Sequence, residues 1–386
     1  MKFIKWFLIV MISILLLGEI AILVSGKIFL NKVFALTVFS GKLSPDIDEL
    51  SLFPSREIAT GKPQAWVVTD TYNKKKLPDD IIQKIEAFKT TSFLVIKHDT
   101  IVYENYWEQH NNKSVTNSFS MAKSFTAALI GIALKQGLIK SIDEPVGNYI
   151  DSYKTGEKAK ITIAHLLTMS SGVGFDETYN SPWAWPSEAY YGEDVNGLTL
   201  KSDVVEAPGK VFNYKGGDSQ LLGMILKKVL GAQSLSDYAA KNLWQPMGAE
   251  QPAFWSLDKE AGMEKVSCCW YATSRDFARI AKLYMQYGSW NGQQLIDSSY
   301  IQQSITLAPL LKTNGKPNDQ YGYQWWITNY KSHPIFYCRG IRGQYIFAIP
   351  DKNIIAVRTG HKRGTKQGDE LPSDIFVYLD AALLFE

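Results

Sequence analysis

The stretch "SFSMAKSFTAALIGIALKQGLI", residues 118–139, places two hydroxyl groups and a lysine at the head of a long apolar run. Ser120 lies three residues before Lys123, and this spacing places both side chains on one face of a helix. A lysine that enters a hydrophobic core costs free energy unless it is paired or loses its proton. Its presence at this point therefore suggests a chemical task.

The pattern S-x-x-K occurs twice, at Ser120/Lys123 and at Ser256/Lys259, so the pattern alone is weak evidence. The first copy opens an apolar helix, whereas the second lies in a polar stretch. On the first segment alone, an ordinary helix start with polar residues explains the sequence as well as a reactive serine does. A reactive serine needs a base, and a lysine whose pKa is lowered by burial can serve as one.

Other kinds of catalytic or ligand site have less support. The chain has no G-x-S-x-G, so a Ser-His-Asp arrangement on a nucleophile elbow is not indicated. His165, in "ITIAHLLTMSSG", has the spacing of a residue that packs within a helix. There is no C-x-x-C, H-E-x-x-H or P-loop, and the five histidines form no cluster in the sequence. We therefore expect neither a metal nor a cofactor.

The composition is that of a folded chain with little net charge. Of 386 residues, 46% are hydrophobic and 20% are charged, and the formal net charge is +3. This predicts one large domain or two closely packed ones, and no nucleic-acid partner. Cys268 and Cys269 are adjacent and Cys338 stands alone, so no framework of paired disulfides is expected and the core must hold the fold.

The N-terminus has the pattern of a targeting segment. Lys2 and Lys5 precede an apolar run over residues 6–24, as in a signal peptide. The run is also long enough to span a bilayer as an uncleaved anchor, although Glu19 argues against a deeply seated span. We assign residues 1–30 to a signal peptide or N-terminal membrane anchor. The expected location is periplasmic or otherwise extracytoplasmic, with residues 6–24 in the inner membrane if they are retained.

The rest of the sequence indicates two groups of strands around a helical block. Residues 31–90 are interrupted by prolines and are expected to form a lead-in that ends in a helix near 79–89. The β-rich runs 92–96 and 101–107 predict a hairpin. Helical periodicity then dominates to about residue 290. Later strands are predicted at 321–327, 334–338 and 343–360, before a closing helix from residue 373.

This order predicts an α/β (α+β) fold. A mostly antiparallel sheet, flanked by helices, is interrupted by an inserted helical subdomain of about residues 115–290. A site at the junction of the two parts would draw its residues from distant points in the sequence.

Five collinear segments between about residues 90 and 360 resemble the serine β-lactamase and penicillin-binding-protein superfamily. They are "SFSMAKSF", "ITIAHLLTMSSGV", "PGKVFNYKGGDSQLLG", "GMEKVSCCWYATSRDFARIAKLYMQYGSWNGQQLI" and "CRGIRGQYIFAIPD". The chain is most similar to the class C-like branch, which includes esterases and 6-aminohexanoate-dimer hydrolases. The resemblance implies a β-lactamase/transpeptidase-like serine hydrolase domain over residues 91–386.

The resemblance also implies roles for individual residues. Ser120 would be the acylated nucleophile, Lys123 its proton partner and Tyr214 a second base. A phenol beside an ammonium is easier to deprotonate, so Tyr214 and Lys123 could share one proton. The oxyanion hole would use the backbone N–H groups of Ser120 and Ile341.

Two motifs depart from the pattern of the superfamily. Many relatives have Tyr-x-Asn where this chain has Tyr214-Lys215-Gly216, so a side-chain amide is missing. They have Lys-Thr-Gly where it has Cys338-Arg339-Gly340, so a cation for a substrate carboxylate is missing. Strand alternation predicts that Arg339 faces away from the cleft, whereas Arg342 could reach over the rim. Both departures argue against recognition of a β-lactam rather than against hydrolysis.

Substrate contacts are expected from an aromatic segment and from the two altered motifs. The segment 181–197 either lines a pocket for an apolar acyl chain or pins a loop to the helical lobe. The expected contact residues are Trp183, Tyr190, Gly216, Cys338, Gly340 and Arg342.

The sequence therefore predicts a serine hydrolase that cleaves esters or linear amides of small molecules, and whose second partner is the membrane. Two alternatives stay open. One is a D,D-peptidase or penicillin-binding protein that acts on peptidoglycan. The other is a non-catalytic binding protein on the same fold.

Overall fold

The structure, a computed structural model, describes residues 2–38, 44–366 and 371–386. The helices are α1 (Lys2–Ser25), α2 (Phe29–Val33), α3 (Asp79–Ala87), α4 (Ala122–Lys135), α5 (Ile163–Leu167), α6 (Trp185–Tyr191), α7 (Val195–Leu200), α8 (Gly216–Leu230), α9 (Leu235–Ala239), α10 (Ser274–Met285), α11 (Ser298–Ser304) and α12 (Ser373–Leu383). The strands are β1 (Ser55–Ile58), β2 (Val67–Val68), β3 (Thr90–Lys97), β4 (Thr100–Tyr106), β5 (Thr116–Asn117), β6 (Val211–Phe212), β7 (Ala253–Ser256), β8 (Trp270–Ala272), β9 (Ser289–Trp290), β10 (Gln293–Gln294), β11 (Leu311–Lys312), β12 (Trp326–Tyr330), β13 (His333–Gly340), β14 (Gln344–Ile349) and β15 (Ile354–Gly360).

A seven-stranded sheet forms the main layer, in the order β12-β13-β14-β15-β3-β4-β2. Its neighbours are antiparallel, apart from the parallel pair of β2 and β4. The β3–β4 hairpin turns at His98 and Asp99, which both have positive φ, at 47° and 60°. Two left-handed residues suit the twist of a tight hairpin. The hairpin predicted from the runs 92–96 and 101–107 is present. The strand segment predicted at 343–360 forms a second hairpin, with β14 and β15 as its strands.

Helices cover both faces of this sheet. α10 packs against β14 and β15, while α12 and α3 lie on the opposite face. In β3 every residue except Lys97 is buried, as expected for a strand covered on both sides. Its side chains alternate between two core clusters, with Leu94 in one and Phe93 in the other.

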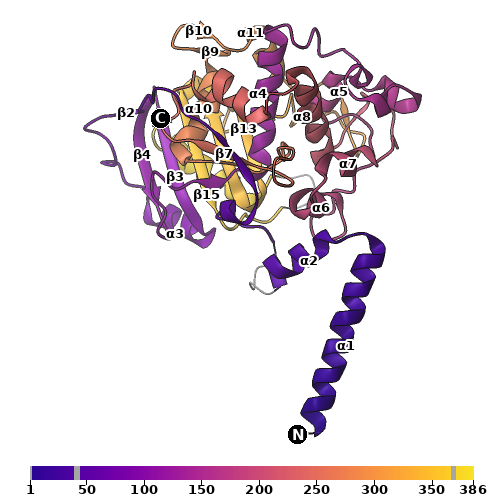
Figure 1. Cartoon of the computed structure of the whole chain (residues 1–386). Coiled ribbons are helices and arrows are strands. Elements are labelled where there is room, and N and C mark those ends of the chain that lie inside the picture. Colours follow the sequence, from indigo (N-terminus) through magenta and orange to yellow (C-terminus); the bar gives the residue numbers. More distant parts are fainter. Residues whose placement is uncertain (1, 39–43, 367–370) are drawn as a thin grey trace.

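The helical lobe is built around α4 and α8, which pack against each other. α4 is buried on all sides over residues 122–133, which explains the long apolar run after Ser120. Gly131 lies so close to Tyr300 that an added Cβ would stand 2.7 Å from its ring, so glycine is required there. Figure 1 shows α5, α6, α7 and α8 together on one side of the molecule, opposite β3 and β4.

The block of residues 115–290 is less helical than its periodicity indicates. It contributes β5, β7 and β8 to a second sheet, which has the order β1-β7-β8-β5. Trp255 and Trp270 lie opposite each other on β7 and β8 and are fully buried. In addition, α10 leaves the helical lobe to cover the main sheet. Within the predicted range 115–290, α10 therefore packs with the sheet rather than with the other helices.

Residues 44–90 are integrated into both sheets. β1 pairs with β7, in a register that places Ser55 opposite Ser256, and β2 extends the edge of the main sheet beside β4. The helix expected near 79–89 is α3, which packs on α12. This segment therefore holds the two sheets together rather than merely leading into them.

A disulfide joins Cys268 to Cys269, while Cys338 is a buried free thiol. The described residues thus hold one bridge between neighbours, where no framework of paired disulfides was expected. A bond between adjacent residues closes almost no loop, so it removes little entropy from the unfolded chain. The fold is held by its core, as the sequence indicates.

Helix α1 projects away from the rest of the molecule (Figure 1). None of its residues is buried, and it contains an 18-residue window with a mean hydropathy of 2.9. Its 24 residues extend for about 36 Å at 1.5 Å per residue, against a hydrocarbon core of about 30 Å. Within the described residues it is the helix long and apolar enough to cross a membrane, a property shared by signal sequences and anchors.

Candidate active site

The residue expected to be the nucleophile, Ser120, lies in a single 3-10 turn, Phe119–Met121, immediately before α4. Phe119 has φ +44°, which is uncommon for a bulky residue and indicates strain held in place by its surroundings. Its N–H donates to Oδ1 of Asn117 at 2.9 Å, and the N–H of Ser118 donates to the Trp270 carbonyl at 2.9 Å. The second sheet thus fixes the turn that presents Ser120.

Lys123 is buried beneath this turn, with a relative exposure of 3%. Its Nζ lies 3.1 Å from Oγ of Ser120, as the helical spacing predicts. The same nitrogen donates to the backbone carbonyl of Ser267 at 2.5 Å. It also stands 5.2 Å from the centre of the Tyr214 ring. A hydroxyl and an amine at this distance are able to exchange a proton, and the phenol ring lies beside the amine.

Tyr214 is held at the junction between β6 and α8. The N–H of the preceding residue, Asn213, donates to the Met169 carbonyl at 2.8 Å. The phenol ring lies against Trp326 and Tyr321, at centroid distances of 5.1 and 5.8 Å. These rings restrict how Tyr214 can turn, so its position is set by packing from the main sheet.

The end of β13 meets the nucleophile turn. At Gly340 an added Cβ would lie 2.4 Å from the carbonyl oxygen of Ser118, so the two backbones are in direct contact. Ile341 follows at once and begins a short turn. This contact brings the two segments expected to form the oxyanion hole together, from residues more than 200 positions apart in the sequence.

Glu177 is a polar residue near the site that the sequence analysis missed. Its Oε1 accepts a hydrogen bond from the N–H of Gly216 at 2.5 Å. Burial raises the pKa of this carboxyl, and the charge of Lys123 opposes part of that rise. Gly216 itself has no room for a side chain, because an added Cβ would stand 2.5 Å from the Trp185 ring. Glu177 lies between the recognised motifs, so no sequence signal marked it.

Asp218, two residues into α8, is fully buried and accepts a hydrogen bond from Oγ of Ser171 at 2.5 Å. Burial raises the pKa of this carboxyl from 3.8 to about 7, although Ser171 and the charge of Lys215 oppose the rise. Between these two pKa values the folded chain holds a proton that the unfolded chain has released. The free energy of unfolding should therefore fall as the pH rises through this range.

From pH 5 to pH 8 we expect this one group to lower the free energy of unfolding by about 3 kcal/mol, and Asp218→Asn to lack that loss. Urea unfolding of both proteins at the two pH values measures it. Every other titrating group, including the buried Lys265, is present in both proteins. Only the difference between the two changes of unfolding free energy with pH therefore reports on Asp218. Equal slopes would show that Asp218 is ionised in the folded chain at pH 5.

Of the expected contact residues, Tyr190 and Cys338 are buried, whereas Trp183 is largely exposed. Tyr190 is buried in a separate cluster, with its ring 5.0 Å from Phe53 and its hydroxyl donating to Oε2 of Glu49 at 2.9 Å. Tyr190 therefore packs within the protein, as in the second of the two roles predicted for the aromatic segment. Trp183 is 55% exposed. Cys338 is buried against α4, and burial raises the pKa of its thiol, so its side chain offers almost no exposed surface.

The side chains of Arg339 and Arg342 do not point where the sequence predicts. Arg342 donates to the carbonyl of His361 at 2.8 Å and to Oγ of Ser44 at 2.8 Å, so its guanidinium binds the chain rather than reaching over the cleft. Arg339 stacks on Trp326 at 3.6 Å, and that ring contacts Tyr214. Strand alternation is obeyed, but Tyr214 packs on the face to which Arg339 points. The predicted directions of both side chains are therefore wrong.

The structure also places the second S-x-x-K and His165. Ser256 lies in strand β7 and Lys259 in an exposed turn, so the second S-x-x-K is not a helical pair. His165 closes a capping box at the start of α5, where its Nδ1 accepts from the N–H of Thr162 at 3.2 Å. It serves the helix rather than a reaction.

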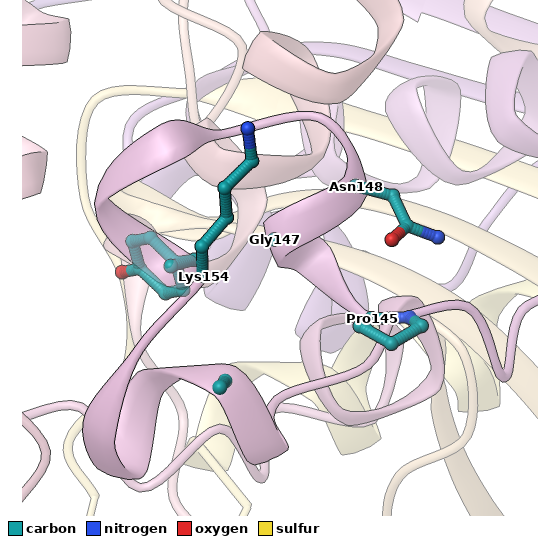
Figure 2. A pocket seen from close by; sticks show the side chains of 6 residues that line it. Pro145, Gly147, Asn148 and Lys154 are labelled. Atoms are coloured by element: carbon teal, nitrogen blue, oxygen red, sulfur yellow. The ribbon is translucent and has the colours of Figure 1, made fainter.

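A pocket of about 540 Å³ lies elsewhere, among the short turns that follow α4 (Figure 2). It is lined by Pro145, Gly147, Asn148, Tyr153, Lys154 and Ala159. The ammonium group of Lys154 pairs with Asp151 at 2.6 Å. None of the lining residues belongs to the Ser120 site, so the pocket offers that site no binding surface.

Comparison with known proteins identifies the family. The family model described as Beta-lactamase matches residues 78–377, which is most of the chain. The chain therefore belongs to the beta-lactamase family, as the five sequence segments indicate.

Individual relatives agree with this assignment. The chain is 23% identical to the 6-aminohexanoate-dimer hydrolase of Paenarthrobacter ureafaciens over 335 residues, which cover 80% of this chain and 82% of that enzyme. A solved Bacillus anthracis structure, provisionally named a 6-aminohexanoate-dimer hydrolase, matches with a TM-score of 0.72 at 22% identity, over 86% of this chain and 91% of the other. A D-stereospecific amidohydrolase from a Streptomyces species matches with a TM-score of 0.60 at 16% identity, over 80% and 100%. These structural matches confirm the predicted beta-lactamase-like α/β fold.

Proposed function

Because the chain belongs to the beta-lactamase family, we propose that it is a serine hydrolase that cleaves ester or linear amide bonds through an acyl-enzyme on Ser120. The observation that carries the proposal is the buried amino group of Lys123, whose Nζ lies 3.1 Å from the Ser120 hydroxyl and faces the Tyr214 ring. A binding protein needs no such base beside a serine. The hydrolases among the relatives support an enzyme on this fold.

The proposed reaction has two halves. Oγ of Ser120 attacks the substrate carbonyl carbon while its proton passes to the Lys123–Tyr214 pair, and the carbonyl oxygen becomes an oxyanion held by backbone N–H groups of Ser120 and Ile341. The bond to the leaving group then breaks, and the leaving group takes up that proton. In the second half a water molecule gives its proton to the same pair and attacks the acyl carbon. The bond from that carbon to Oγ of Ser120 then breaks, Oγ takes the proton back from the pair, and the acid is released.

Labelling with a fluorophosphonate probe tests the proposal directly. The full chain in detergent should be labelled at Ser120, and Ser120→Ala should not be labelled. Ser256→Ala is the matched control, because Ser256 is the other S-x-x-K serine and lies in a strand far along the sequence from Lys123. Absence of labelling in the folded wild-type chain would favour the non-catalytic binding protein.

The substrate class follows from the charges that surround the site. The residue that replaces the lysine of Lys-Thr-Gly, Cys338, is a neutral buried thiol, and Arg342 is engaged by Ser44 and His361. A lost charge-assisted contact costs about 1.5–3 kcal/mol, or roughly 10–100-fold in affinity. We expect kcat/KM for p-nitrophenyl butyrate to exceed that for nitrocefin by at least this factor, measured on one preparation.

Arg339 offers a matched variant for the same measurement. Its guanidinium lies over Trp326, beside Tyr214, and is placed to attract a substrate carboxylate. Arg339→Gln should lower kcat/KM for nitrocefin, which carries a carboxylate, more than for the neutral ester. Nitrocefin equal to or better than the ester in the wild type would instead favour a D,D-peptidase with Arg339 as its carboxylate ligand.

We also propose that α1 delivers the domain across a membrane and, if retained, anchors it there. Its length, its apolar surface and its projection from the body support this (Figure 1). Deleting residues 1–26 should give a protein that is soluble without detergent and has unchanged ester kinetics. Native full-length protein in the cytosolic fraction would refute the proposal.

A further inference from the structure

Two histidines that are far apart in the sequence meet at the surface of the main sheet. His110 lies four residues beyond the end of β4, and His361 directly follows β15. Their ring centres are 6.1 Å apart, and Asp48, from the segment that precedes β1, lies against both rings. The carboxylate of Glu108 completes the group. No part of the proposed hydrolase mechanism uses these residues.

The distances among Asp48, His110 and His361 are short enough for these residues to share one metal ion, and Glu108 lies beside His361. Nε2 of His110 is 3.1 Å from Oδ1 of Asp48, and Nε2 of His361 is 3.8 Å from Oδ2 of Asp48 and 3.3 Å from Oε2 of Glu108. Bonds of about 2.1 Å to a tetrahedral ion would place neighbouring ligand atoms about 3.4 Å apart. Ligand atoms from Asp48, His110 and His361 all lie within 4.8 Å of one another.

The other ring nitrogens are held as they are in metal-binding histidines. Nδ1 of His361 lies 2.6 Å from Oδ1 of Asp46, and Nδ1 of His110 lies 3.1 Å from the backbone oxygen of Glu108. When Nδ1 donates its proton to an oxygen, a neutral imidazole directs the lone pair of Nε2 outward, and both Nε2 atoms point into the cluster. Simple ion pairs do not require this supporting layer on both rings.

The cluster is also accessible to an ion. The imidazole side chains are only 12% and 16% exposed, which holds them in place, whereas Asp48 and Glu108 are 46% and 49% exposed. An ion can therefore enter from the carboxylate side and meet two fixed nitrogens.

We infer that Asp48, His110, His361 and Glu108 form a binding site for a divalent transition-metal ion, for which Zn²⁺ is the best match. Two imidazoles together with carboxylates suit zinc better than magnesium or calcium, which prefer oxygen ligands. The sequence does not predict this site, because the two histidines are separated by 251 positions in the chain (361 minus 110).

The bound ion would fasten residues 44–48 to the elements around Ser120. The carbonyl of Ile47 accepts from the N–H of Asn117 at 2.9 Å, three residues before the nucleophile. Arg342, which follows Ile341, donates to both Ser44 and His361. The ion would therefore stabilise the contact between the nucleophile turn and the end of β13, without touching the substrate.

Thermal unfolding of the full chain in detergent, after removal of metals with EDTA, tests the site. Addition of ZnCl₂ to about 100 times the dissociation constant should raise Tm by about 3 °C, whereas MgCl₂ should not. Isothermal titration should give one zinc ion per chain. A zinc-treated Tm equal to that in EDTA would overturn the inference, and hydrolase activity does not enter either measurement.

Variants assign the response to these residues. His361→Gln and Asp48→Asn should each abolish the zinc-dependent rise in Tm, and Asp48 is exposed enough that its variant should fold. His333→Gln is the matched control, because His333 also pairs with a carboxylate, that of Asp351 at 2.5 Å, but lies outside the cluster. It should keep the full response. A rise that survives in Asp48→Asn and His361→Gln would show zinc binding elsewhere and would also overturn the inference.

Discussion

Ser120→Ala, Lys123→Ala and Tyr214→Phe should each lower kcat/KM for ester hydrolysis by about three orders of magnitude or more. Each variant removes one member of a set that moves a single proton: the hydroxyl that gives it, the amine 3.1 Å away and the phenol whose ring faces that amine. Once one member is missing, the other two have no pathway left to support. The double and triple variants should therefore be little worse than the single ones.

Steady-state kinetics on all seven combinations of these variants would measure the coupling. Ser256→Ala should keep wild-type kinetics, since Ser256 is a buried strand residue of the second sheet. Effects that multiply independently across the double variants would contradict a shared proton relay. Thermal unfolding of each variant must accompany the kinetics, because Lys123 also binds the Ser267 carbonyl and its loss could loosen the fold.

Gly340→Ala should reduce kcat by about two orders of magnitude even though it adds a single methyl group. The added Cβ would stand 2.4 Å from the carbonyl oxygen of Ser118, closer than real carbon–oxygen contacts allow. The carbonyl oxygen belongs to the backbone and the Cβ is bonded directly to it, so neither atom can rotate away. Strand β13 must therefore move away from the nucleophile turn by several tenths of an ångström. A displacement of about 1 Å in a catalytic arrangement is enough for a loss of this size.

Gly315→Ala separates this effect from a general loss of stability. Gly315 has φ +78° and no atom within 4 Å of an added Cβ, so its substitution strains the backbone by about 1 kcal/mol without a clash. We expect Gly315→Ala to lower Tm and leave kcat unchanged, and Gly340→Ala to lower both. Unchanged kcat in Gly340→Ala would show that the end of β13 does not take part in the reaction.

Much of the local structure is encoded in neighbouring residues of the sequence, although strands β5, β7 and β8 are not apparent from its periodicity. The apolar run after Ser120 could only be a helix buried on all sides, and the i, i+3 spacing within it placed Lys123 against the hydroxyl. The hairpins were equally clear, because alternating β-rich runs and short turns are encoded by neighbouring residues. The five collinear segments were sufficient to indicate the family. In each case the interacting residues lie close together in the chain, or are matched as a local pattern.

Which faces of the strands line the site, and which residues distant in the chain come into contact, depends on tertiary packing. Strand alternation placed Cys338 and Arg339 on opposite faces, but which face carries Tyr214 depended on the packing of Trp326 from another strand. Likewise Glu177 faces the site, and His110 meets His361, through contacts between segments that share no pattern in the sequence. Burial and hydrogen bonding in three dimensions set these contacts, and a one-dimensional periodicity holds no information about them because it reports only on a residue's own helix or strand.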